Sequence, residues 1–94
     1  MGHRIESDSM GKVKVPDDAL YGAQTQRAIE NFPISGRRFP STFINMLGEL
    51  KLACALANRT LKQLDNSIAD AIMHAAQKVS DGECDDHFPI DIFQ

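Results

Sequence analysis

The stretch STFINMLGELKLACALANRTL, residues 41–61, decides the fold. Its apolar residues recur at intervals of three and four, the period of an amphipathic helix. One stripe holds Phe43, Leu47, Leu50, Cys54, Ala57 and Leu61, and a second stripe beside it holds Met46, Ala53 and Leu56. Ser41 or Thr42, just after Pro40, is expected to cap the helix. Because apolar residues cover so much of the circumference, we expect more than one neighbour to bury this helix, with Cys54 packed inside.

Weaker helical patterns lie on both sides of this stretch. A helix over residues 66–81 is expected to start near Asp65, with Ser67–Asp70 as a capping box, and to stop at Gly82. Its apolar stripe is Ile68, Ile72, Ala75, Ala76 and Val79. A shorter helix is expected over residues 24–32, and it is weakened by the glycine that precedes it.

The chain begins with an extended pattern. Val13 and Val15 alternate with Lys12 and Lys14, the period of two that is typical of an exposed strand. Together with Ile5 they predict either a short hairpin or two extended arms, which need other elements to lie on. The sequence therefore predicts a mainly α fold of about three helices in a single partial domain over residues 1–94. Its parts are an extended or β-hairpin arm (1–16), a helical region (17–82) and a tail (83–94).

Size and charge exclude several classes of protein. Ninety-four residues allow one small domain at most. Ten Lys and Arg against thirteen Asp and Glu give a net charge of −3, which disfavours nucleic-acid partners and a basic membrane anchor. The apolar runs are too short for a membrane helix, and no secretory signal is visible at the N-terminus. Two cysteines are typical of free thiols in a reducing compartment. We therefore predict a cytoplasmic protein, with a mitochondrial parent as the alternative.

The tail is apolar where chain ends are usually polar. Residues 83–94 contain Phe88, Ile90, Ile92 and Phe93 and stop at Gln94. Because termini usually lie exposed at the surface, we expect either that the chain is a fragment of a longer protein or that the tail folds back onto the helices.

The chain offers few candidates for chemistry. Residues 84–87, Cys-Asp-Asp-His, gather four potential metal ligands, but their spacing matches neither a zinc site nor a calcium loop. A solvated acidic turn is the simpler interpretation, and no metal is predicted. Arg37 and Arg38 can bind an anion or remain solvated. Arg27 follows a small, polar stretch and has the planar fork that suits a carboxylate. Spacing alone yields no complete active site.

Several strings together resemble the opening of class II fumarate hydratases. The matching strings are RIESDSMG (4–11), VP (15–16), GAQTQR (22–27), ENFPISG (30–36), DG (81–82), DD (85–86) and FPIDIFQ (88–94). They span residues 4–94 in order. Aspartate ammonia-lyase, the nearest rival, tends to differ at Ser9–Gly11 and Ala23–Gln26. Asp17 and Cys84 depart mildly from the pattern, where the family commonly has a small residue and a polar residue respectively.

The resemblance implies the N-terminal helical domain of the fumarase/aspartase fold. It implies a much longer parent that forms a homotetramer and reversibly hydrates fumarate to (S)-malate, with no metal or organic cofactor. It also implies that the catalytic groups and the substrate loop lie beyond Gln94, so this chain holds no catalytic residue and is inactive alone. Arg27 and Thr25 are then the substrate-binding candidates, near the mouth of the active site. The alternatives are part of an aspartate ammonia-lyase and a non-catalytic helical module that self-associates.

Overall fold

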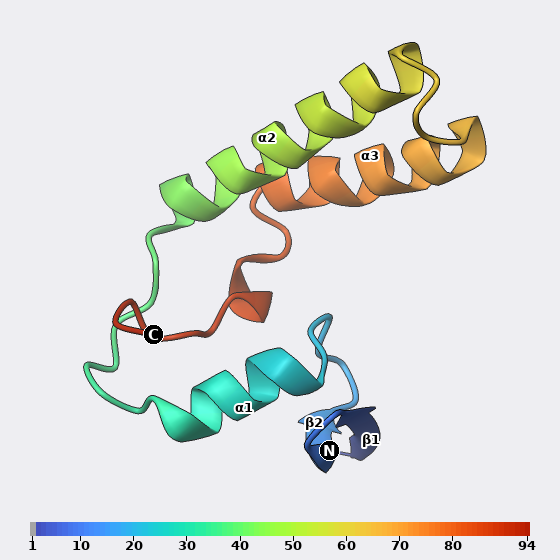
Figure 1. Cartoon of the computed structure of the whole chain (residues 1–94). Helices are drawn as coiled ribbons and strands as arrows, with labels where there is room; N and C mark the ends of the chain where they lie inside the picture. Colours follow the sequence, from blue (N-terminus) through green and yellow to red (C-terminus); the bar gives the residue numbers. More distant parts are fainter. Residues whose placement is uncertain (1) are drawn as a thin grey trace. The chain divides into compact units, whose positions relative to one another are not determined.

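The computed structural model describes residues 2–94 and is mainly α-helical, with an N-terminal β-hairpin (Figure 1). Its elements are β1 (His3–Asp8), β2 (Gly11–Pro16), α1 (Ala23–Asn31), α2 (Ser41–Thr60), α3 (Asn66–Ser80) and the 3-10 turn η1 (Asp85–His87). The three predicted helices and the hairpin are confirmed, and the helix ends agree to within one residue. The chain forms two compact units. Unit 1 runs to Phe39 and includes Asp86–Gln94, and unit 2 is Pro40–Asp85. The single partial domain stays a prediction.

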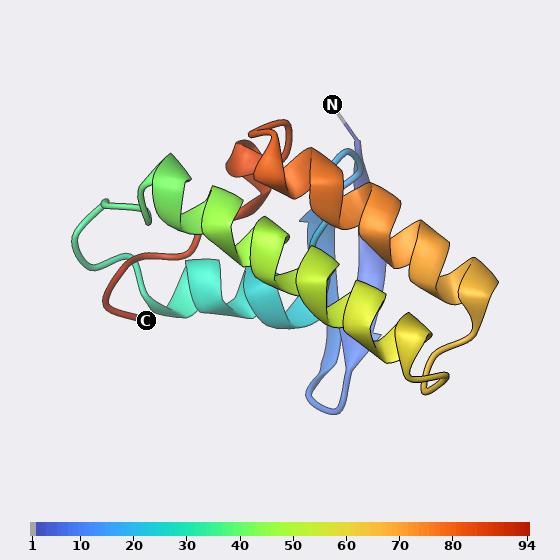
Figure 2. The same cartoon turned by 90° about the horizontal axis from the view of Figure 1, so that it is seen from above.

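Unit 1 is built on the hairpin. β1 and β2 pair antiparallel in a register that sets Asp8 opposite Gly11, so Ser9 and Met10 form the turn. The Met10 amide donates to the Asp8 carboxylate at 2.9 Å, and Gly11 adopts φ 116°, a conformation that favours glycine. Val15 on β2 is fully buried. α1 packs on both strands and supplies the support that an isolated hairpin lacks (Figure 2).

Unit 2 is a helical hairpin in which α2 and α3 lie side by side (Figures 1 and 2). The residues buried between these helices are small apart from one isoleucine: Ile44, Gly48 and Ala55 on α2, and Ala69 and Ala76 on α3. At Gly48 the backbones come so close that an added Cβ would lie 2.5 Å from the Ser80 nitrogen. Small side chains therefore set the distance between the two helices.

The structure corrects two predicted helix starts. The N-cap of α2 is Pro40, whose ring has no oxygen to cap the helix, and the Pro40 carbonyl accepts from the Phe43 and Ile44 amides. The capping box at Ser67 is also wrong. Asp65 is the N-cap of α3, and its carboxylate accepts from both the amide and the hydroxyl of Ser67. These bonds lower the pKa of Asp65, chiefly through the hydroxyl.

The predicted stop of α3 at Gly82 is confirmed. Gly82 has φ 87° and donates to the Val79 carbonyl, while Glu83 donates to the Lys78 carbonyl at 3.0 Å. This pair of bonds is the Schellman ending, in which glycine takes the left-handed position.

The predicted burial of the main α2 stripe is wrong. Leu50 and Leu61 of that stripe are 56% and 66% exposed, and Cys54 is exposed rather than packed. Met46 of the second stripe is also 57% exposed. α3 contacts the opposite side of α2, where the small residues allow close approach. Within residues 2–94, no helix is long and apolar enough to cross a bilayer.

Candidate functional site

The loop between β2 and α1 is organised by Arg4. Its guanidinium donates to four backbone carbonyls, those of Pro16 (2.9 Å), Asp17 (3.1 Å), Ala19 (2.9 Å) and Tyr21 (2.7 Å). Its Nε forms an ion pair with Glu6 at 2.6 Å. One side chain thus fixes the path of the backbone into α1. This role could not be predicted from the sequence, because an arginine on a strand with alternating polarity looks like any solvated charge.

Arg27, a predicted substrate-binding residue, lies on α1 and donates two hydrogen bonds to the Asp8 carboxylate. Arg27 Nε to Asp8 Oδ2 is 2.8 Å, and Arg27 Nη2 to Asp8 Oδ1 is 3.0 Å. Nη2 also donates to the Gly11 carbonyl at 3.2 Å, and Gln24 donates to Asp8 at 2.6 Å.

The pair is largely shielded, with 21% of the Arg27 side chain and 11% of the Asp8 side chain exposed. The hydrogen bond from Arg27 holds the pKa of Asp8 below its usual value, and the same bond raises the pKa of Arg27. The guanidinium of Arg27 is therefore already bound to a carboxylate of its own chain, and this contact links α1 to the hairpin.

Thr25, the other predicted substrate-binding residue, lies in the first turn of α1, after the N-cap Gly22. It is half-buried. Within the part of the chain that the structure describes, its hydroxyl has no hydrogen-bond partner. Residues two apart on a helix point to different sides, so Thr25 and Arg27 do not converge on one point.

Asp91 holds the tail (residues 83–94) against the loop after α1 through a set of hydrogen bonds, here called the Asp91 clasp. Its Oδ2 accepts from the Ser35 amide (2.7 Å), the Ser35 hydroxyl (2.8 Å) and the Gly36 amide (3.0 Å), and its Oδ1 accepts from the Phe93 amide (2.9 Å). Only 8% of Asp91 is exposed. These donors, led by the Phe93 amide, lower the pKa of Asp91 to about 2. The Ile92 amide also donates to the Arg37 carbonyl at 3.0 Å, so the tail folds back along this loop.

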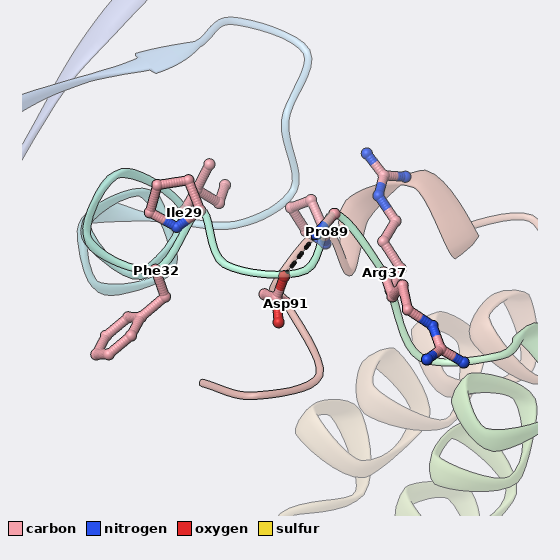
Figure 3. A pocket seen from close by; sticks show the side chains of 8 residues that line it. Ile29, Phe32, Arg37, Pro89 and Asp91 are labelled. Carbon is pink, nitrogen blue, oxygen red and sulfur yellow. Dashed lines mark hydrogen bonds between the residues drawn. The ribbon is translucent and has the colours of Figure 1, made fainter.

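A hollow of about 320 Å³ lies beside this clasp (Figure 3). It is lined by Ile29, Phe32, Pro33, Gly36, Arg37, Arg38, Pro89 and Asp91. Arg38 lies 3.9 Å from Asp86 in an exposed ion pair. Because both oxygens of Asp91 already accept hydrogen bonds, that carboxylate is a structural anchor and a poor general base. The hollow offers apolar walls and arginine charge but no acid–base pair. Anion binding at Arg37 and Arg38 stays a prediction.

The acidic segment at residues 84–87 has separate local roles. Cys84 is buried. The His87 Nδ1 accepts from the Leu20 amide at 3.1 Å, which links the tail to the loop before α1. Within residues 2–94 there is no group of three or more His, Cys, Asp or Glu side chains able to hold a metal ion.

Comparison with known proteins adds evidence that this local geometry cannot supply. A family model described as Lyase matches residues 11–94. The class II fumarate hydratase of Halobacterium salinarum is 56% identical over 92 residues, and that of Mycobacterium tuberculosis is 58% identical over 92 residues. Each match covers 98% of this chain but only 20% and 19% of the respective relative.

Solved structures show the same relation. The class II fumarase from Schistosoma mansoni superposes with a TM-score of 0.92 at 35% identity, over 99% of this chain and 20% of that one. A fumarate lyase:delta crystallin from Brucella melitensis bound to cobalt gives 0.91 at 37% identity, over 99% and 21%. The chain therefore spans about a fifth of the length of the relatives it matches.

Proposed function

The chain belongs to the lyase family, and on this basis we propose that it forms the N-terminal fifth of a class II fumarate hydratase. The whole enzyme would add water reversibly across fumarate to give (S)-malate. The observation that carries this proposal is identity of 56% and 58% to two such enzymes across 98% of the chain.

Within that enzyme, this chain would supply structure around the active site rather than its reactive groups. Hydration requires a base that exchanges a proton next to a carboxylate, and donors that stabilise the resulting dianion. The carboxylates best held in unit 1, those of Asp8 and Asp91, are both consumed by internal hydrogen bonds. The base and the donors would therefore come from the rest of the enzyme. We further propose a homotetramer in the cytoplasm that works without a metal or organic cofactor.

The predicted substrate-binding residues keep different places in this proposal. Arg27 would act indirectly, since its guanidinium fixes the hairpin to α1 through Asp8. Thr25 retains a hydroxyl that is free to bond outside the described part of the chain. We propose Thr25 as the candidate for direct contact with substrate and Arg27 as a positioning residue.

A chimera tests the proposed function. This chain would replace the matching fifth of the Mycobacterium tuberculosis fumarate hydratase, and the loss of fumarate absorbance would report hydration. We expect the chimera to convert fumarate to malate at a rate within about tenfold of the unmodified enzyme. The reactive groups would be the same in both proteins, and only small differences in how this chain positions them would remain. The unmodified enzyme is the control. A folded chimera that leaves fumarate untouched would refute the proposal.

A further inference from the structure

We infer that α2 carries a docking surface for the remaining four-fifths of the hydratase. This outer stripe consists of Met46, Leu50, Cys54, Ala57 and Leu61. The inference rests on the proposed function and adds to it an interface on this chain.

The stripe is continuous by helix geometry. Its members are spaced four, four, three and four apart, so they line one side of the helix over about 22 Å. Ile44, Gly48 and Ala55, which are buried against α3, lie on the opposite side. The helix therefore has one face already packed and another apolar face without a partner in unit 2.

The exposure of this stripe exceeds what scattered surface residues would give. More than half of each of Met46, Leu50 and Leu61 is exposed, and Cys54 and Ala57 between them are also exposed. Single exposed apolar residues are ordinary, but contiguous apolar patches mark interaction sites. No charged residue interrupts the stripe, so the surface that covers it should be apolar too.

The lengths of the relatives identify the occupant. Proteins of 56% and 58% identity devote 20% and 19% of their length to the segment matched by this chain, and all the rest is polypeptide that this chain lacks. An exposed apolar helix face, on a chain that matches only a fifth of its relatives' length, is best explained by burial against that larger remainder. A second copy of this chain is the alternative occupant, and it is an outcome of the test below.

Cys54 supplies a readout that does not depend on activity. Its thiol is exposed in this chain, whereas Cys84 is buried and serves as an internal reference. In the chimera described above, mass spectrometry after brief alkylation would locate the label. We expect labelling of Cys54 to slow by about tenfold or more in the chimera, since burial protects a thiol from reagent. Cys84 should stay protected in both proteins.

Leu50→Asp tests the energetics of the same surface. In the isolated chain its Tm should stay within about 2 °C of the original, because Leu50 is solvated there. In the chimera it should lower the Tm by about 5 °C or more, because docking would bury an unpaired carboxylate. Asn58→Asp is the matched control. It adds the same charge to α2 outside the stripe and should change neither protein.

Several outcomes would overturn the inference. Cys54 labelled equally fast in both proteins, or a chimera that tolerates Leu50→Asp, would show that the stripe is not docked. A Leu50→Asp change that unfolds the isolated chain, or light scattering that shows dimers built on the stripe, would assign it to another occupant. A chimera that never folds would also contradict it. If the chimera is active but its Cys54 remains reactive, only this inference is contradicted. If the chimera is inactive but its Cys54 is protected, only the proposed function is contradicted.

Discussion

At the scale of single residues, unit 1 is held by a few polar side chains that each satisfy several backbone groups. Arg4 donates hydrogen bonds to four carbonyls, Asp91 accepts them from three amides and a hydroxyl, and Arg27 donates to Asp8. Such charge-assisted bonds are stronger than neutral ones, and leaving their partners unpaired is costly. Unit 1 therefore depends on specific polar contacts more than on a large apolar core.

Asp91→Asn should lower the free energy of unfolding and make that free energy less dependent on pH in acid. The folded pKa of Asp91 is about 2, below its ordinary value of 3.8. A lowered folded pKa stabilises the protein above the unfolded pKa, and this stabilisation is lost as the pH falls from about 4 towards 2. Urea unfolding at a series of pH values should show a shallower loss of stability for Asp91→Asn over that window.

Asp86→Asn is the control for this experiment, because the side chain of Asp86 is 98% exposed and makes only a long ion pair. It should leave the profile nearly unchanged. If Asp91→Asn and the original chain lose stability in parallel between pH 4 and pH 2, the clasp does not act as described.

Arg27→Lys and Asp8→Asn should be strongly coupled. Lysine cannot reproduce the bidentate grip of arginine, so Arg27→Lys should lower the Tm by about 2–5 °C. In the Asp8→Asn background the same change should have much less effect, since the acceptor charge is already gone. A double-mutant cycle by thermal unfolding measures this coupling. Simple additivity would mean that the two side chains act independently.

The partners of Arg27 and Asp91 could not be predicted from the sequence. Arg27 was singled out for its fork, but its partner Asp8 is 19 residues away and only the hairpin brings the two together. Asp91 finds Ser35 at a separation of 56 residues, which no local pattern reveals. Partners this remote depend on tertiary structure, so the candidate site could be predicted by residue type but not by contact.

At the scale of elements, periodicity predicted where the helices lie but not which face of α2 is buried. Leu50 and Leu61 dominate the apolar pattern, yet α3 packs against Gly48 and Ala55. Neither the small-residue face nor the large apolar face of α2 carries a charge at its centre. The pattern of apolar residues therefore could not predict which of the two faces packs against α3. Close approach of the two backbones favours the small face, as in other tightly packed helix pairs.

Gly48→Ala should destabilise unit 2. The added Cβ would lie 2.5 Å from the Ser80 nitrogen and 2.9 Å from the Ala76 carbonyl oxygen, so the helices must separate. Overpacking of this kind costs about 1–3 kcal/mol, which urea denaturation can measure. Gly22→Ala is the matched control, because nothing lies within 4 Å of its Cβ position. Equal stability of Gly48→Ala and the original chain would contradict the observed helix spacing.

Gly82→Ala should weaken the end of α3. Gly82 sits at φ 87°, and a residue with a side chain costs about 1–2 kcal/mol in such a left-handed conformation. The loss should appear as faster amide exchange just after α3, at the amides of residues 82 and 83, which donate to the last turn of the helix. Unchanged protection there would show that the Schellman ending does not hold the helix.

At the scale of the whole molecule, motif order predicted more than physical patterning did. Composition and periodicity indicated a small, mainly α protein and no active site. The ordered strings from Arg4 to Gln94 indicated the family, and the comparisons support that assignment over 98% of the chain. The reactive groups could not be located because the described residues contain no free acid–base pair beside the hollow.

We propose that fumarate hydration needs these 94 residues together with the remaining four-fifths of a hydratase. The most direct measurement mixes this chain with the separately purified remainder of the Mycobacterium tuberculosis enzyme and follows fumarate absorbance. We expect turnover in the mixture and none from either polypeptide alone. Steady hydration by this chain alone, or a mixture no more active than its parts, would contradict it.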